Sequence, residues 1–104
     1  MDFKSLGDNL GLEEDEFLEI VELFIDTANN DFQKIQKAVN DDNSNLIAES
    51  SHSLKGAAGN LGFKEISGNA EFIEKIARSG KINGFDVQLS DIQKGLKEIK
   101  NKLG

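Results

Sequence analysis

One stretch decides how the chain can fold: Ser51-His52-Ser53-Leu54-Lys55-Gly56-Ala57-Ala58-Gly59-Asn60-Leu61-Gly62, which contains the chain's single histidine. If residues 44–61 form a helix, its apolar side chains gather on the face opposite His52, since successive residues turn by about 100°. The face predicted to be buried comprises Ile47, Ser50, Leu54, Ala57, Ala58 and Leu61. The pattern therefore predicts a helix that buries one side in a core and presents His52 to solvent.

The predicted solvent face carries small residues and one cation. Ala48, Lys55, Gly56 and Gly59 fall within about 60° of His52 around the helix. Each glycine costs a helix about 1 kcal/mol relative to alanine, and neither glycine points toward the predicted core. We interpret the small residues as clearance that lets another macromolecule reach the imidazole. Lys55, one turn along, is placed to stabilise an anionic group carried on the ring.

Helical periodicity extends over most of the remaining chain. Apolar residues recur every three or four positions in residues 12–40, 64–79 and 86–103, and no strand-like alternation appears. In the first range these residues are Phe17, Ile20, Val21, Phe24, Ala28, Phe32, Ile35 and Val39. In the second they are Ile66, Ala70, Ile73, Ile76 and Ala77, with Phe72 and the preceding Phe63 adding bulk. In the third they are Leu89, Ile92, Leu96, Ile99 and Leu103, and Phe85 directly before the range continues the spacing. Short connections between long helices predict antiparallel neighbours. The predicted fold is all-α: an antiparallel up-down-up-down four-helix bundle forming one domain over residues 1–104.

Some local features leave alternatives open. Asn29-Asn30 weakens the first long helix, because asparagine competes for backbone hydrogen bonds. Residues 12–40 are therefore predicted as one helix with a kink or as two helices nearly end to end. Gly62 is a natural C-terminal residue for the helix that carries the histidine. Residues 1–11 are predicted to form a short helical turn lying across the bundle.

Leu18 and Ile25 lie about 90° from the main stripe of the first helix. They either edge the core or are exposed and form apolar contacts for a partner. Charge is also uneven: residues 1–50 carry 13 acids and 3 bases, whereas residues 51–104 carry 6 acids and 9 bases. The acidic run at residues 13–16 is either a solvated helix face favoured by the helix dipole or a surface that steers a partner.

Composition excludes several classes of function. The net charge of −7 argues against a nucleic-acid partner, whose phosphates would repel the chain. The absence of cysteine excludes disulfides and thiolate metal sites, and a single histidine excludes a multi-histidine metal site within one chain. No apolar run approaches the roughly 20 residues of a membrane span, and the N-terminus lacks the features of a secretory signal. We expect a cytoplasmic monomer that does not contact membranes.

The segment from His52 to Ala58, followed by Leu61-Gly62, resembles the motif of histidine phosphotransfer (HPt) domains of two-component phosphorelays. The helical pattern from about residue 12 to 103 matches the size of such a domain. The resemblance implies the same helical bundle, with His52 carrying the phosphoryl group. It also implies two kinds of partner: a response-regulator receiver domain, which supplies an aspartate and bound magnesium, and a histidine kinase or hybrid kinase. Gly59 falls at a variable position of the motif, so its predicted role depends on geometry alone.

The predicted chemistry is phosphoryl transfer without a cofactor. A neutral imidazole nitrogen can attack phosphorus, and the transfer needs mainly positioning and charge stabilisation. The chain lacks a P-loop, a kinase-type glycine loop and an evident cluster of metal-binding acids around His52. We therefore expect a phosphocarrier rather than an enzyme with its own ATP site. Its predicted receiver-docking surface comprises Gly56, Gly59, Ala48, Leu18 and Ile25.

Three alternatives remain at this stage. The chain is an interaction module that docks a receiver without being phosphorylated, or it is the phosphoacceptor domain of a chemotaxis-type kinase. The third alternative is an enzyme that uses His52 as a general base. It is the weakest, because a convex helix face offers no pocket that excludes water.

Overall fold

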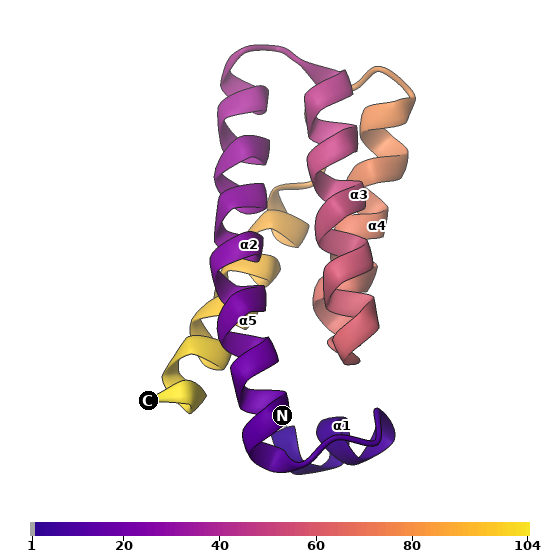
Figure 1. Ribbon diagram of the computed structural model, residues 1–104. Helices are drawn as coiled ribbons and strands as arrows, with labels where there is room; N and C mark the ends of the chain where they lie inside the picture. Colours follow the sequence, from indigo (N-terminus) through magenta and orange to yellow (C-terminus); the bar gives the residue numbers. More distant parts are fainter. Residues whose placement is uncertain (1) are drawn as a thin grey trace.

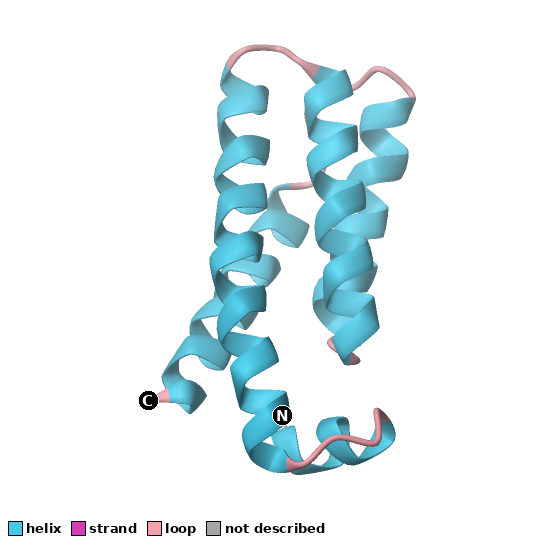
Figure 2. Cartoon of the chain, viewed as in Figure 1, coloured by secondary structure: helices cyan, strands magenta, loops and turns pink. Residues whose placement is uncertain are grey.

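The computed structural model describes residues 2–104, which form five helices and no strand (Figures 1 and 2). The helices are α1 (Phe3–Asn9), α2 (Glu14–Asn40), α3 (Ser44–Leu61), α4 (Lys64–Arg78) and α5 (Asp86–Leu103). The chain reverses direction at each connection from α2 to α5 (Figure 1). Helix α2 packs against α3 and α5, and α4 packs against the same two helices. The predicted antiparallel four-helix bundle is therefore confirmed.

The predicted boundaries lie close to those observed. The ranges 44–61 and 86–103 coincide with α3 and α5, and α4 ends one residue earlier than predicted. Helix α2 begins at Glu14 rather than residue 12, because a capping box marks its start: the backbone N–H of Glu13 donates to Oε1 of Glu16 at 3.0 Å. The helix runs unbroken through Asn29-Asn30, so the single-helix alternative is confirmed.

The turn between α3 and α4 is short and sets these helices side by side. Helix α3 ends at Leu61 and is capped by Gly62, which adopts a left-handed conformation with φ of +87°. The backbone N–H of Phe63 then donates to the carbonyl of Ala58 at 2.9 Å, and α4 begins at Lys64. Because the connection has only two residues, α3 and α4 must be antiparallel neighbours. Their interface holds the groups described below.

Helix α1 lies across one end of the bundle (Figure 1). Its N-cap residue Asp2 accepts a hydrogen bond from the backbone N–H of Lys4 at 3.1 Å. Phe3 is buried, and its ring centroid lies 5.9 Å from that of Phe17 and 6.3 Å from that of Phe63, both in edge-to-face geometry. The predicted N-terminal turn is thus a seven-residue helix that closes the apolar end of the bundle.

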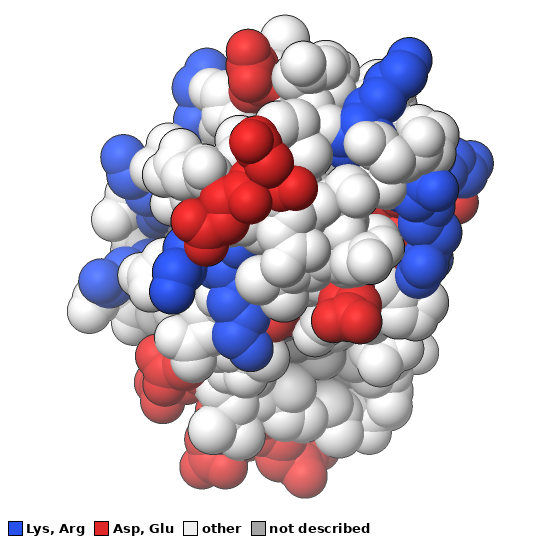
Figure 3. Space-filling view, turned by 90° about the horizontal axis from the view of Figure 1, so that it is seen from above, with Lys and Arg blue, Asp and Glu red and all other residues white. Residues whose placement is uncertain are grey.

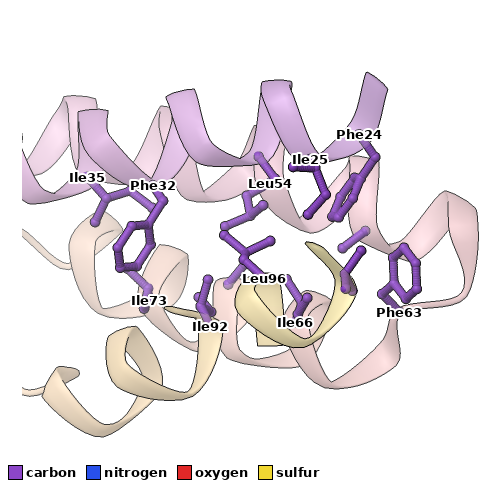
Figure 4. Packing of buried hydrophobic residues seen from close by; sticks show 14 of the residues in the cluster. Phe24, Ile25, Phe32, Ile35, Leu54, Phe63, Ile66, Ile73, Ile92 and Leu96 are labelled. Carbon is purple, nitrogen blue, oxygen red and sulfur yellow. The ribbon is translucent and has the colours of Figure 1, made fainter. Parts of the chain in front are cut away.

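The core runs along the bundle axis, where side chains from α2, α3, α4 and α5 point inward (Figure 4). Two predicted core residues lie instead on the surface: Ile20 is 37% exposed and Phe72 is 43% exposed. Each stands one residue before a fully buried one, Val21 and Ile73 respectively. Neighbouring residues of a helix differ by about 100°, and at these two positions the second residue of the pair points toward the core while the first lies at its edge.

The surface is polar, and both signs of charge are present. Seen from the end that carries the α2–α3 connection, acidic and basic side chains are interspersed among neutral ones (Figure 3). The acidic run that starts α2 lies at the opposite end of that helix, in its first turn. No helix within residues 2–104 combines the length and apolar character needed to cross a membrane.

Candidate functional site

His52 projects from the middle of α3 to the outside of the bundle. Its side chain is 61% exposed, as the helical pattern predicts. One edge of the ring nevertheless has a partner: Nδ1 lies 2.9 Å from Oε2 of Glu74 on α4. The imidazole is therefore accessible to a second macromolecule while it is held in orientation by the neighbouring helix.

Glu74 connects the charged groups of the site. Its side chain is only 7% exposed, yet three side chains contact its two oxygens. Oε1 lies 2.9 Å from Nζ of Lys55, and Oε2 accepts from Arg78 through Nε at 2.9 Å and through Nη2 at 2.6 Å. A buried charge is tolerated in a protein when it is paired in this way.

The pairing keeps Glu74 ionised. Burial alone would raise the pKa of this carboxyl group, because desolvation disfavours the charged form. Hydrogen bonds from Lys55, Arg78 and His52, in that order, outweigh the burial and lower the pKa of Glu74 to about 2. At neutral pH the site therefore contains a permanent carboxylate next to the imidazole.

Lys55 lies where the sequence predicts, one turn along α3 from His52, and its side chain is 31% exposed. Its ammonium group is not simply solvated, because it binds the same carboxylate as the imidazole. Glu74 thus fixes both the predicted nucleophile and the predicted cation on one side of α3.

The two glycines of the histidine face have different surroundings. A Cβ atom added at Gly56 would meet nothing within 4 Å, so this position is open as predicted. A Cβ atom at Gly59 would lie 3.2 Å from Oγ of Ser67 on α4. Ser67 in turn donates to the backbone carbonyl of Lys55 at 3.0 Å. Gly59 is exposed, as predicted, but its lack of a side chain also permits the close approach of α3 and α4.

The prediction that Ala48 lies on the exposed face around His52 is wrong. Ala48 is 3% exposed and belongs to the core. A helical projection gives angles around α3 alone and does not show how far neighbouring helices extend over its sides. Ser51, which lies on the same side of α3 as Ala48 and about 100° from His52, is fully buried as well. The exposed face around His52 is thus narrower than the projection predicts.

Helix α2 borders the histidine face on its other side. Oγ of Ser53 donates to Oδ2 of Asp31 at 2.8 Å, and Asp31 is only 6% exposed. This contact joins the residue next to His52 to α2, as Glu74 joins His52 itself to α4. The sequence prediction included neither Asp31 nor Ser53.

The two predicted docking residues of α2 do not form an exposed surface. Ile25 is 6% exposed and points into the core (Figure 4), and Leu18 is partly buried against the same core. Of the two alternatives, the core-edge placement is confirmed, because Leu18 and Ile25 extend the inner face of α2. The exposed apolar residues of α2 are instead Ile20 and Leu23, which are 37% and 69% exposed.

Glu74 and Arg78 were not predicted as site residues. One signal in the sequence marks Glu74: it stands four residues after Ala70 and one after Ile73, so a carboxylate borders the apolar stripe of α4. Arg78, four residues further on, is at the spacing of a helical ion pair. What the sequence does not supply is the register that brings this pair to His52.

Comparison with known proteins identifies the family. Residues 19–102 match the family model of the Hpt domain. The phosphorelay intermediate protein YPD1 of Candida albicans is 35% identical over 74 residues, which make up 71% of this chain and 39% of that protein. The chain thus spans well under half the length of this relative.

A solved structure shares the fold. The crystal structure of histidine-containing phosphotransfer protein B (HptB) from Pseudomonas aeruginosa PAO1 superposes with a TM-score of 0.84, covering 99% of this chain and 90% of that chain at 17% sequence identity. The shared architecture agrees with the family match, which covers most of the sequence. The chain therefore belongs to the Hpt domain family.

Proposed function

We propose that this protein is a phosphocarrier in which His52 accepts a phosphoryl group and passes it on. The donor is the aspartyl phosphate of a response-regulator receiver domain or a histidine kinase, and the acceptor is the aspartate of another receiver. The observation that carries the proposal is the exposed imidazole of His52, held by a buried carboxylate beside Lys55. Membership of the Hpt domain family supports it.

The transfer step follows from the geometry of the ring. Nδ1 is occupied by Glu74, so the nitrogen that attacks is Nε2. Its lone pair forms a bond to phosphorus while the bond between phosphorus and the aspartate oxygen breaks, and the aspartate leaves as a carboxylate. Transfer to the next receiver reverses these steps. Lys55 stabilises the negative charge on the phosphoryl oxygens, and magnesium on the receiver would supply the remaining charge compensation.

The proposed docking surface follows the observed exposure. Gly56 leaves room beside His52, and α2 offers Ile20 and Leu23. Ile20 stands three turns before Asp31 on the same face of α2, and Asp31 contacts the residue next to His52. Ile20 therefore lies on the side of α2 that contacts α3, and Leu23 follows it within one turn. We propose that a receiver covers Gly56, Ile20 and Leu23.

The carrier needs no cofactor of its own in this proposal. No group of three or more metal-ligating side chains within residues 2–104 is arranged to hold a metal ion. The acidic, cysteine-free composition supports a cytoplasmic location. We propose that the protein acts there as a monomer.

Incubation with a phosphorylated receiver domain tests the proposal. A phosphocarrier gains one phosphate that is labile in acid and stable in base, as expected for phosphohistidine, while the receiver loses its own. A docking module that is not phosphorylated binds the receiver without gaining label. An absence of label in the presence of demonstrated binding would therefore favour the module over the carrier.

A further inference from the structure

Two hollows on the surface adjoin along the seam between α2 and α5. The first has a volume of about 250 Å³ and lies between the two helices, where the buried side chains of Phe32 and Leu96 form its floor. The second, of about 300 Å³, is lined by α2 alone. Gln33 lines both hollows, so they form one continuous depression, which we call the α2–α5 trough.

The trough is lined by cations and by no anion. Its four lysines are all exposed: Lys34 and Lys37 on α2, and Lys97 and Lys100 on α5. Among residues 2–104, no aspartate or glutamate lines either hollow, although the chain has 19 acidic residues and 12 lysines and arginines. None of the four lysines forms an ion pair with another described residue. The trough is therefore a concentrated positive region on a protein of net charge −7.

The turn of each helix sorts the charges in this way. Asp31 adjoins the trough residues in sequence, but its side chain lies on the α3 side of α2, where it accepts a hydrogen bond from Ser53. Glu98 directly follows Lys97, but it lines hollows on the α4 side of α5. Because successive residues turn by about 100°, these carboxylates leave the side of each helix that the lysines occupy. The trough thus keeps its positive charge despite acidic neighbours in the sequence.

Side-chain amides supply hydrogen-bonding groups among the lysines. Gln33 and Gln36 on α2 and Gln93 on α5 line the trough, and their exposed side chains hydrogen-bond to no other described residue. Each amide offers both donors and an acceptor, so it can pair with the N–H and C=O groups of a polypeptide backbone. The lysines add charge-assisted contacts to carboxylates. Together these groups match a polypeptide that carries acidic side chains.

Two other classes of anionic partner match the trough less well. A membrane-binding surface combines basic side chains with apolar ones that enter the lipid, and none of the exposed large apolar residues lines the trough. A long nucleic acid would also run over the acidic N-terminal half of α2, whose charge repels phosphates. A short acidic peptide covers the trough alone. Residues 29–37 of α2 rise by about 12 Å, which an extended peptide spans with about four residues.

We infer that the α2–α5 trough is a second interaction surface and that it binds a short acidic segment of a partner polypeptide. Its position separates it from the phosphoacceptor, because α2 packs against both α3 and α5. Asp31 and Ser53 mark the side of α2 toward His52, whereas the trough opens along the side toward α5. A segment bound there leaves His52 and Gly56 uncovered. The inference does not depend on the proposed phosphotransfer.

NMR titration of the ¹⁵N-labelled protein with a capped oligoglutamate peptide locates the contact. The same peptide made of glutamine is the control. We expect the largest shifts in residues 29–37 and 93–100, including the side-chain NH₂ groups of the three glutamines, and no such shifts with the glutamine peptide. Shifts spread evenly over lysines outside the trough, such as Lys64 and Lys81, would overturn the inference.

A pair of double variants tests the role of the trough lysines. Lys34→Gln combined with Lys97→Gln removes two charges from the trough, and Lys64→Gln combined with Lys81→Gln removes two exposed charges elsewhere. Both proteins should remain folded, because the changes are on the surface, and thermal melting checks this. The trough variant should bind the oligoglutamate peptide about fivefold more weakly, as expected for two exposed ion pairs. Equal losses in the two variants would show that only net charge matters and would contradict the inference.

The choice of partner is tested with two other polyanions. Vesicles that contain phosphatidylserine and a short single-stranded oligonucleotide should both bind more weakly than the oligoglutamate peptide at the same ionic strength. Tighter binding of either one, lost in the trough variant, would contradict an acidic polypeptide as the occupant.

Transfer from a phosphorylated receiver in the presence of saturating oligoglutamate peptide tests whether the two surfaces are separate. The transfer rate should be unchanged, and the trough variant should accept phosphate at the wild-type rate. A peptide that blocks transfer would place the trough within the docking surface of the receiver and would overturn its assignment as a second surface. If the protein gains no phosphate from any donor, the proposed function fails, while the peptide titration still decides the inference.

Discussion

Oε2 of Glu74 on α4 lies 2.9 Å from Nδ1 of His52 on α3. The contact bridges two helices that a two-residue turn holds side by side. The proposed nucleophile is thus exposed on one side and supported on the other by a buried charge. Predictions about this site can therefore separate the chemistry of the ring, the charge around it and the access of a partner.

Replacing Lys55 with alanine should slow phosphotransfer without abolishing it. Lys55 is one of two cations that pair with Glu74, and its side chain is partly exposed. Loss of such a contact is expected to raise the barrier by about 1–2 kcal/mol, which is roughly five- to thirtyfold in rate. Rapid-quench measurement of transfer from a phosphorylated receiver gives the rate directly. An unchanged transfer rate would mean that Lys55 only forms an ion pair with Glu74 and does not stabilise the phosphoryl group.

Replacing Gly56 with glutamine should reduce transfer from a receiver while the fold stays intact. The position is open, with nothing within 4 Å of an added Cβ atom, and removing a helical glycine stabilises a helix by up to ~1 kcal/mol. The long side chain would obstruct a docking protein but not a small molecule. Phosphoramidate labelling should therefore be less affected than labelling by the receiver.

Gly59→Gln is the informative comparison for Gly56→Gln. A side chain at residue 59 meets Ser67 at the α3–α4 contact, so this variant should have a lower melting temperature than Gly56→Gln. Equal stability of the two variants would show that the two glycines have equivalent surroundings. A wild-type rate of transfer from the receiver to Gly56→Gln would show that residue 56 is not part of the docking surface.

Replacing Leu23 with serine should weaken receiver binding and leave labelling by phosphoramidate unchanged. Leu23 is 69% exposed on α2, so its removal costs little in the core. Val87→Ser is a matched control, because Val87 is 66% exposed on α5, a helix that packs against α2 and α4. Titration with a receiver domain measures both affinities. Equal affinities for these variants would exclude Leu23 from the interface.

The Glu74 cluster should make stability depend on pH in acid. The pKa of Glu74 falls from an ordinary value of 4.5 to about 2 in the folded protein. Because the folded pKa is the lower one, the ionised carboxylate contributes stability that is fully present above about pH 4.5 and lost as the pH falls toward about 2.

Urea unfolding of the wild-type protein and of Glu74→Gln at a series of pH values checks this contribution. The difference between their free energies of unfolding should shrink as the pH falls from about 4.5 to about 2. A difference that does not change over this window would show that the carboxylate is not stabilised by its partners.

The bundle could be predicted from the sequence because helical periodicity and short connections are local properties. The positions of α3 and α5 coincide with the predicted ranges for that reason. Glu74 could not be predicted as a partner of His52, since their contact depends on the register between two helices. The misplacement of Ala48 has the same origin, and so does the contact of Gly59 with Ser67, which was not predicted: a projection of one helix does not show which of its sides a neighbour covers.

Ile20 and Phe72 illustrate a related limit. Both are large apolar residues at the edge of a stripe, and a single-helix pattern does not decide which of two adjacent residues enters the core. Their neighbours Val21 and Ile73 do so completely. Which side chains at such edges stay exposed can be determined only when the packing of all the helices is known.

The most direct test of the central claim is label uptake by His52→Gln from a phosphorylated receiver. The glutamine side chain has no nucleophilic nitrogen, and its amide can still donate to Glu74, so the bundle should melt near the wild-type temperature. We predict that the variant takes up no acid-labile phosphate while the wild-type protein does. A folded His52→Gln protein that still becomes phosphorylated from the receiver would contradict the assignment of His52 as the phosphoacceptor.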